Sequence, residues 1–235
     1  MLPGKRTGKS KTLPVTKSRT TKHYPYKLHG HTLESVTSAK YLGVTIRHDL
    51  SWDDHITGVV NKANRTLGFL RRNLKISSRN IKERAYKAFV RPLLEYASSI
   101  WDPHTKKAVG KLEMVQRRAA RFVLNRYRNT SSVSNMIDIL GWQSLEERRR
   151  IQRLTLLYKI RGGLVHCPDL ERKLIPSASR QRRGCVHNHQ LQTITSNKQY
   201  RNASFLPRTI KEWNNLPKEI VEAKTVDTFV YHIGH

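Results

Sequence analysis

The chain has 235 residues, of which 37% are hydrophobic, so it is long and apolar enough to bury the core of one large domain, with or without a tail. Its 45 lysines and arginines face only 17 aspartates and glutamates, a formal net charge of +28, and this excess favours a polyanionic partner, above all nucleic acid. Two cysteines argue against a disulfide scaffold, and we find neither an apolar run of membrane-spanning length nor a secretory signal, so we expect an intracellular protein with no membrane partner.

Short β-structure is expected near the N-terminus. Residues 1–22 are rich in Lys, Arg and Thr and predict a basic, mostly disordered tail. Residues 23–50 predict a small β-hairpin that turns at Gly30. Within this region, the stretch SAKYLGVTI at residues 38–46 is interpreted as one short strand that Gly43 interrupts.

The hydrophobic period changes to that of a helix at residue 51. A first long helix is predicted from residue 52 to residue 74, because apolar residues recur there at steps of three and four. A second helix begins after Ser78, and Pro92 is expected to kink it. The apolar stripe expected to face the core from this second helix consists of Ile81, Ala85, Phe89, Leu93, Tyr96 and Ile100.

Three more helices complete the central region. One spans residues 106–126 and a short one spans residues 133–140. The last begins at a capping box formed by Ser144 and Glu147 and runs to Gly162.

The fold class is therefore mainly α, a helical bundle with a small N-terminal β-hairpin. We expect residues 51–163 to form one helical domain. Residues 164–202 predict a loop-rich linker, because the periodicity fades and prolines recur. Residues 203–235 predict a C-terminal helical segment.

Two groups of residues resemble metal ligands at first sight. Asp53 and Asp54 are adjacent, but neighbours on a helix point about 100° apart, and carboxylates in a first turn are favoured by the helix dipole. We therefore interpret both as helix-capping residues. A Cys/His set that matches no compact zinc-finger spacing consists of His166, Cys167, Cys185, His187 and His189. The sequence thus predicts no catalytic residue, no metal and no cofactor.

Basic clusters are the strongest functional signal. On the helix at residues 106–126, Arg117 and Arg121 share a face that is separate from the apolar face. Few acids interleave with the basic residues, so surface salt bridges do not account for them, although an ordinary solvated face is the alternative. The residues expected to contact phosphates are Arg71, Arg72, Lys75, Arg117, Arg118, Arg121, Arg126, Arg149 and Arg153.

Five phrases occur in a fixed order along the chain: SAKYLGVTI…LSWDDHI, KAFVRPLLEYASSIWDP, KLEMVQRRAARFV, ILGWQSLEERRRIQRLTLLYKI and SFLPRTIKEWNNLP. Together they resemble the C-terminal part of the reverse transcriptase of jockey-like non-LTR retrotransposons. The resemblance covers roughly residues 24–231. Each phrase alone is weak, whereas the five in this order are specific.

The resemblance implies a role for KYLGV as the primer-grip hairpin. Tyr41, Leu42 and Gly43 would then support the terminal backbone of a primer, and the helices after Ser51 would form a thumb-like bundle on a template–primer duplex. Such enzymes carry their metal-binding aspartates in a palm domain upstream of the grip, and no matching turn precedes Tyr41 here.

We therefore expect a nucleic-acid-binding fragment of an RNA-directed DNA polymerase that has no polymerase activity on its own. The basic tail would be a palm remnant, and the compartment implied is the nucleus. The partners implied are an RNA–DNA or DNA duplex and, as a further expectation, a palm-containing polymerase fragment. Two alternatives stay open, namely a basic helical protein-interaction module and a mobile-element remnant without function.

Overall fold

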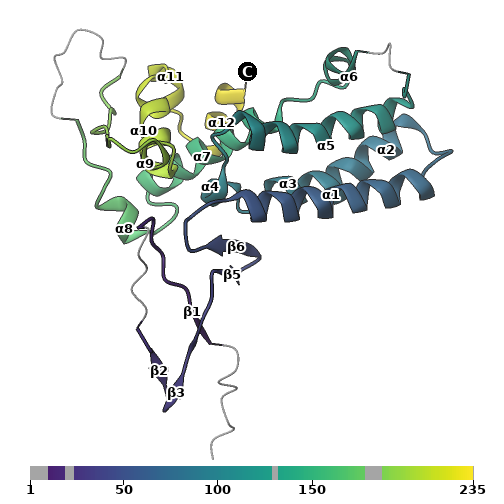
Figure 1. Cartoon of the computed structure of the whole chain (residues 1–235). Helices are drawn as coiled ribbons and strands as arrows, with labels where there is room; N and C mark the ends of the chain where they lie inside the picture. The colour runs from purple at the N-terminus through teal and green to yellow at the C-terminus, as the bar shows by residue number, and fades with distance from the viewer. Residues whose placement is uncertain (1–9, 19–23, 129–131, 178–186, 235) are drawn as a thin grey trace, which may run out of the picture.

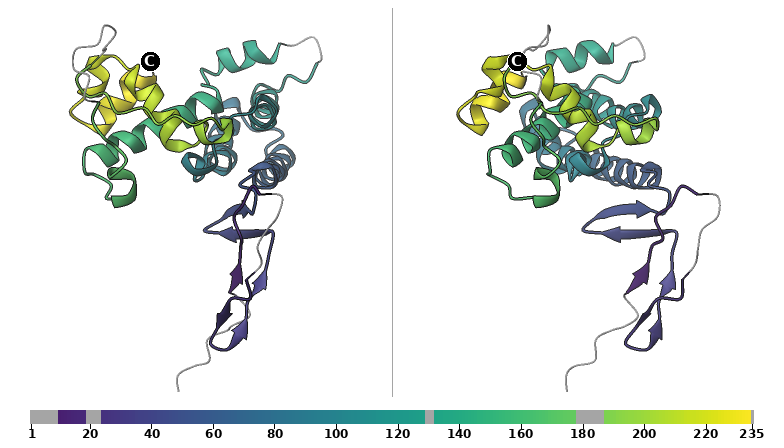
Figure 2. Two further views of the ribbon diagram at one scale, coloured as in Figure 1. Left: turned by 60° about the vertical axis from the view of Figure 1, so that its left-hand side comes forward. Right: turned by 90° about the vertical axis from the view of Figure 1, so that its left-hand side faces the viewer.

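The computed structural model describes residues 10–18, 24–128, 132–177 and 187–234. The protein is mainly helical, with a small set of strands before the helices, so the predicted fold class is confirmed. The strands form an arm that projects from the helical body (Figures 1 and 2). The greater part of the predicted N-terminal tail lies outside the described residues.

The arm consists of three two-stranded sheets. The parallel pair joins β1 (Lys11–Thr12) to β4 (Glu34–Ser35), and the antiparallel pairs join β2 (Lys27–Leu28) to β3 (His31–Thr32) and β5 (Ser38–Tyr41) to β6 (Val44–Arg47). The predicted turn at Gly30 is confirmed, because Gly30 (φ +80°) and its neighbour His29 (φ +48°) connect β2 to β3. No side chain described between residues 10 and 43 is buried.

The stretch at residues 38–46 is two strands, and the prediction of one interrupted strand was wrong. Leu42 (φ +45°) and Gly43 (φ +85°) both have positive φ, the geometry of a type I′ hairpin turn. In the resulting register, Tyr41 pairs with Val44 and Ser38 pairs with Arg47. Glycine alone adopts such a conformation without strain, so Gly43 marks the turn rather than a gap in a strand.

The first long helix and its partner follow the hairpin. They comprise α1 (Asp53–Asn73), α2 (Arg79–Ala85), the π-helical turn η2 (Tyr86–Val90), α3 (Arg91–Glu95) and α4 (Ser98–Trp101). The wide π turn ends two residues before Pro92, so the helix is irregular next to the position where a kink was expected. Proline has no N–H for the regular helical bond, and a π turn accommodates that loss.

The apolar stripe predicted for the second helix was wrong at four of its six positions, whereas Ala85 is buried and Leu93 packs against the core as predicted. Phe89 is 62% exposed and Ile81, Tyr96 and Ile100 are also exposed, whereas the adjacent stripe of Tyr86, Val90 and Leu94 is buried. Both stripes have four-residue spacing, so the spacing alone cannot choose between them. Tyr86 decides the orientation, since its ring stacks on Trp142 with 4.5 Å between centroids.

Three further helices were predicted with nearly their observed bounds: α5 (Lys106–Leu124), α6 (Val133–Ile139) and α7 (Leu145–Arg161). The capping prediction at α7 is confirmed, because the backbone N–H of Glu147 donates to Ser144 Oγ at 3.1 Å. α5 lies against α1 and α2 (Figure 1).

The C-terminal region contains α8 (Pro168–Glu171), α9 (Gln199–Asn202), α10 (Phe205–Asn214), α11 (Lys218–Val221) and α12 (Val226–Gly234). The described part of the predicted linker packs against these helices. Leu191 is buried and forms an isolated β-bridge with Pro176. His187 is also buried, with its Nε2 3.1 Å from the carbonyl oxygen of Trp213.

The buried apolar residues form two clusters. The first core runs from Val44 to Leu145 and the second core from Leu154 to Ile233. α7 contributes to both, because Leu145 belongs to the first and Leu154 to the second. The boundary expected at residue 163 therefore does not coincide with the change of core, which falls within α7.

Candidate nucleic-acid interface

The surface of α1 is basic over most of its length. Residues 55–82 include seven lysines and arginines and no aspartate or glutamate. Lys62, Arg65 and Arg72 share one helical face, because they are three and seven residues apart, and all are exposed. Across the described residues, the carboxylates that flank this stretch pair elsewhere: Asp54 with Arg47 and Glu83 with Lys87.

This basic face of α1, consisting of Lys62, Arg65 and Arg72, suits a polyanion. Ten residues of α-helix extend about 15 Å. One strand of B-DNA advances about 3.4 Å per phosphate along the axis, so this length matches roughly four phosphates. The face therefore has both the charge and the length to follow a nucleic-acid backbone.

The predicted residues Arg71, Arg72 and Lys75 come together at the C-terminal end of α1. With α2 and the end of α5 they line a cavity of about 570 Å³, here called the α1–α5 pocket. Its lining consists of Gly68, Arg71, Arg72, Lys75, Lys82, Phe122, Asn125 and Tyr127. The structure thus assembles one predicted basic cluster into a concave site and adds Lys82 and Tyr127 to it.

The predicted cations on and just after α5 differ in how exposed they are. Arg117, Arg118 and Arg126 are exposed, and Arg118 Nη1 donates to Asn64 Oδ1 of α1 at 3.1 Å. Arg121 is half-buried, and its Nε has no hydrogen-bond partner among the described residues. Arg117 and Arg118 of α5, with Arg126 just after the end of that helix, therefore extend the basic surface of α1.

The predicted hairpin residues form an exposed tip. Tyr41 is 66% exposed and Leu42 is 74% exposed. Tyr96 Oη donates to the carbonyl oxygen of Leu42 at 2.9 Å, which ties the tip to the end of α3. Leu42 adopts a left-handed conformation that costs a branched residue roughly 1–2 kcal/mol, and such strain is typical of functional positions.

A groove of about 550 Å³ separates the hairpin from the helices, here called the hairpin groove. Its lining consists of Lys40, Gly43, Thr45, His55, Gly58, Val59, Lys62, Arg65, Pro92, Leu93 and Tyr96. Sequence reasoning missed the three cations among them, namely Lys40, Lys62 and Arg65. The signal that could have found the two on α1 was the repeat of polar positions at three and seven residues along its exposed face.

His55 fixes the hairpin on α1. Its Nδ1 accepts a hydrogen bond from the backbone N–H of Thr45 at 3.2 Å, and its ring lies edge-on to Trp101 with 5.1 Å between centroids. Burial lowers the pKa of His55, and the nearby charge of Lys40 lowers it further. A neutral imidazole is needed here, because protonated Nδ1 could not accept the Thr45 hydrogen bond.

Replacing Gly43 with alanine should destabilise the hairpin. The φ of +85° is left-handed, and an added Cβ would lie 3.2 Å from Tyr96 Cε1. The left-handed conformation alone should lower the free energy of unfolding by roughly 1–2 kcal/mol. Urea unfolding followed by circular dichroism measures the effect.

Gly110→Ala is the matched control for this substitution. Gly110 lies within α5, and an added Cβ there meets nothing within 4 Å. Alanine should raise the free energy of unfolding at this position by about 0.5–1 kcal/mol, because glycine is the poorer helix former. Equal effects of the two substitutions would contradict the role assigned to Gly43.

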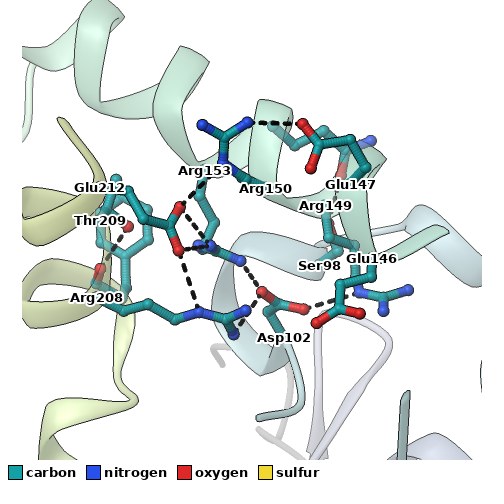
Figure 3. Close-up of polar contacts among 12 residues, drawn as sticks. Ser98, Asp102, Glu146, Glu147, Arg149, Arg150, Arg153, Arg208, Thr209 and Glu212 are labelled. Carbon is teal, nitrogen blue, oxygen red and sulfur yellow. Dashed lines mark hydrogen bonds and ion pairs between the residues drawn. The ribbon is translucent and has the colours of Figure 1, made fainter. Parts of the chain in front are cut away.

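Arg149 and Arg153 do not belong to the interface, and their assignment as phosphate contacts was wrong. Their side chains are 0% and 1% exposed, so no external phosphate reaches them. Arg149 Nε donates to Asp102 Oδ1 at 2.8 Å, and Arg153 donates to Asp102 Oδ2 (Figure 3). Arg153 also contacts both carboxylate oxygens of Glu212 at 2.8 Å. Burial lowers the pKa of both arginines, and nearby carboxylates oppose that change.

The candidate metal ligands are separated or paired. Asp53 and Asp54 lie in the first turn of α1, as predicted, and Asp54 contacts Arg47 Nη1 at 2.7 Å. The interpretation of both as capping residues was wrong, because the N-cap position is Trp52 and no side chain there makes a capping hydrogen bond. Cys185 lies outside the described residues. In the described ranges, no group of three or more His, Cys, Asp or Glu side chains is arranged to hold a metal ion.

The part of the chain that the structure describes contains no helix with both the length and the hydropathy needed to cross a bilayer.

Comparisons with known proteins show a partial similarity to one uncharacterized protein. No family model matches the chain, and no solved structure matches it significantly. The chain is 25% identical over 130 residues to the uncharacterized protein B0403.1 of Caenorhabditis elegans. The match covers 55% of this chain and 66% of that protein, which is just under two thirds of its length.

Proposed function

We propose that this protein binds the sugar–phosphate backbone of a nucleic-acid duplex, as the thumb-like part of a non-LTR retrotransposon reverse transcriptase. Binding is electrostatic and independent of sequence. The polymerase chemistry belongs to a palm domain, so this chain contributes affinity rather than catalysis.

One observation carries the proposal: the basic face of α1 has no acidic counterpart. Several half-buried arginines elsewhere in the described ranges have carboxylate partners, such as Arg47 with Asp49 and Arg150 with Glu147. Throughout the described ranges, Lys62, Arg65 and Arg72 have no carboxylate within ion-pairing distance. Unpaired surface cations of this kind are neutralised when phosphates displace their counterions.

The hairpin supports the same proposal. The β5–β6 tip stands beside the basic face, with the hairpin groove between them. Lys40 on the hairpin and Arg65 on α1 line that groove from opposite sides. A strand that follows α1 would therefore reach Tyr41 and Leu42 at its end, as the resemblance to a primer grip implies.

Removing two charges from the basic face tests the proposal. Arg65→Gln together with Arg72→Gln should weaken binding to a 20-base-pair RNA–DNA hybrid uniformly across sequences. The slope of log affinity against log salt should fall in magnitude by about 2, since each phosphate contact contributes about 1. Fluorescence anisotropy at several salt concentrations measures both quantities.

The matched control removes the same charge from the surface of the C-terminal helical region. Lys211 and Lys224 are exposed on and near the C-terminal helices, away from α1. Lys211→Gln together with Lys224→Gln should leave the salt slope unchanged. If both double variants reduce the slope equally, net charge rather than the basic face of α1 governs binding.

A protein-docking role is the second candidate function. The exposed stripe of Ile81, Phe89 and Ile100 on α2–α4 is the observation that favours it, because clustered apolar surface marks interaction sites. The charge-removal experiment separates the two functions. A module that docks only proteins would bind the hybrid weakly and would not respond to Arg65 and Arg72.

A further inference from the structure

The α1–α5 pocket gathers more charge than the hairpin groove. Four of its eight lining residues are cationic, including Arg72 of the basic face of α1, whereas Lys40, Lys62 and Arg65 are the cations among the eleven that line the hairpin groove. An internal phosphodiester continues in both directions and would have to bend to enter a concave site. The end of a strand can enter it directly.

Lys82 lines this pocket with a side chain that is buried along most of its length. The residue is 6% exposed, and its Nζ lies 5.6 Å from the centroid of the Phe122 ring. In the described part of the chain no carboxylate lies within ion-pairing distance of Lys82. The adjacent Glu83 pairs with Lys87 instead. An ammonium group that lines a pocket without a carboxylate partner suits an anionic ligand.

The charge of the pocket suits a terminal phosphate better than an internal one. Four cationic side chains and no carboxylate line the pocket. A phosphomonoester carries about −1.5 to −2 charges at pH 7, whereas an internal phosphodiester carries one. The additional charge interacts with the same four cations, so the pocket should prefer the monoester.

Tyr127 adds an aromatic surface at the rim. Its ring is 48% exposed, and the Arg71 guanidinium lies over it at 5.3 Å from the centroid. Aromatic side chains next to cationic grooves stack on unpaired bases, whatever the base. The rim is therefore suited to the nucleotide that bears the phosphate.

We propose that the α1–α5 pocket binds the terminal phosphate of a nucleic-acid strand, with Lys82 contacting the phosphate and Tyr127 stacking on the terminal base. This assignment rests on the proposed function and adds to it a preference for strand ends. The remaining cations of the pocket orient the phosphate, while the basic face of α1 holds the adjoining duplex.

The experiment compares otherwise identical hybrids that carry a one-nucleotide overhang. One has a 5′-phosphate, one a 3′-phosphate, and one has hydroxyl groups at all ends. The full chain should bind one of the phosphorylated hybrids at least about tenfold more tightly than the hydroxyl form, as expected for a charge-assisted contact. Anisotropy titrations at one salt concentration give the three affinities.

Two variants assign the preference to the pocket. Lys82→Met keeps an unbranched apolar stem and removes the charge, so it should abolish the preference while changing the affinity for the hydroxyl form little. Tyr127→Leu replaces a half-exposed ring and should reduce the preference, which provides a second test if Lys82→Met does not fold. Lys106→Gln, at the exposed start of α5, is the control and should keep the preference.

Four outcomes would overturn the assignment. Equal affinity for all three hybrids would refute the terminal-phosphate site and leave the proposed function intact. A preference that survives both pocket variants would locate it elsewhere on the protein. A nucleoside monophosphate that binds the pocket while the hybrids show no preference would make this a free-nucleotide site. Failure of every hybrid to bind would instead refute the proposed function itself, and this assignment with it.

Discussion

Replacing Asp102 with asparagine should lower the free energy of unfolding by about 3–5 kcal/mol, the cost of leaving buried charges unpaired. The Asp102 side chain is 5% exposed and receives hydrogen bonds from three arginines. Arg149 Nε and Arg208 Nη1 lie 2.8 Å and 3.0 Å from its oxygens, and Arg153 Nη1 is the third donor. These arginines come from α7 and α10 (Figure 3).

The loss of stability is large because asparagine leaves the charges of two buried guanidinium groups without a full counter-charge. The asparagine side chain keeps the size of aspartate but has one acceptor oxygen and no charge. Arg149 is the more affected of the two, since Asp102 is its ion-pair partner in the described structure, whereas Arg153 retains Glu212. Urea unfolding of both proteins, with the slope of the transition compared, gives the difference.

Asp169→Asn is the control for this measurement. Its side chain is 89% exposed and lies 3.8 Å from Arg172, a surface pair that should contribute nothing measurable. A loss below about 1 kcal/mol for Asp102→Asn would mean that water reaches the buried arginines, contrary to the packing described above.

Affinity for a duplex should fall by 10³–10⁵ between 50 and 200 mM salt if about 6–10 phosphates are neutralised. The basic face of α1, the exposed cations of the α1–α5 pocket, the exposed arginines on and just after α5, and Lys40 of the hairpin together present nine candidate contacts, which is within this range. They are Lys40, Lys62, Arg65, Arg71, Arg72, Lys75, Arg117, Arg118 and Arg126. Each contact releases condensed counterions, and the release is less favourable in concentrated salt.

Equilibrium titrations of an RNA–DNA hybrid at four or more salt concentrations check this dependence. A single strand of equal length serves as the comparison, because its lower charge density should give a slope of about 0.7 rather than 0.9 per contact. An affinity that stays constant over this range would exclude an electrostatic interface and with it the proposed function.

The helical elements were largely predictable because their signals are local. The periodicity of α5 and the Ser144–Glu147 capping box each depend on residues within a few positions of one another. The face of the second helix was not predictable in this way. Stacking of Tyr86 on Trp142 selects that face, and these residues are 56 positions apart in the sequence.

The candidate site was likewise predictable only where its signals are local in the sequence. Arg71–Arg72 and Arg149–Arg150 look alike in the sequence, yet Arg71 and Arg72 line an open pocket whereas Arg149 is buried. The difference comes from Asp102, which lies 47 residues from Arg149. Charge counting along the chain therefore located the basic clusters, and only the tertiary structure separated free charges from neutralised ones.

Because α7 contributes Leu145 to one core and Leu154 to the other, the stabilities of the two cores are coupled. Unfolding of the C-terminal helices would destabilise the helices that carry the basic surface. Conversely, polyanion occupancy at α1 would protect Trp213 in the second core, although no atom there touches the ligand. Resistance to unfolding at one end would thus report on occupancy at the other.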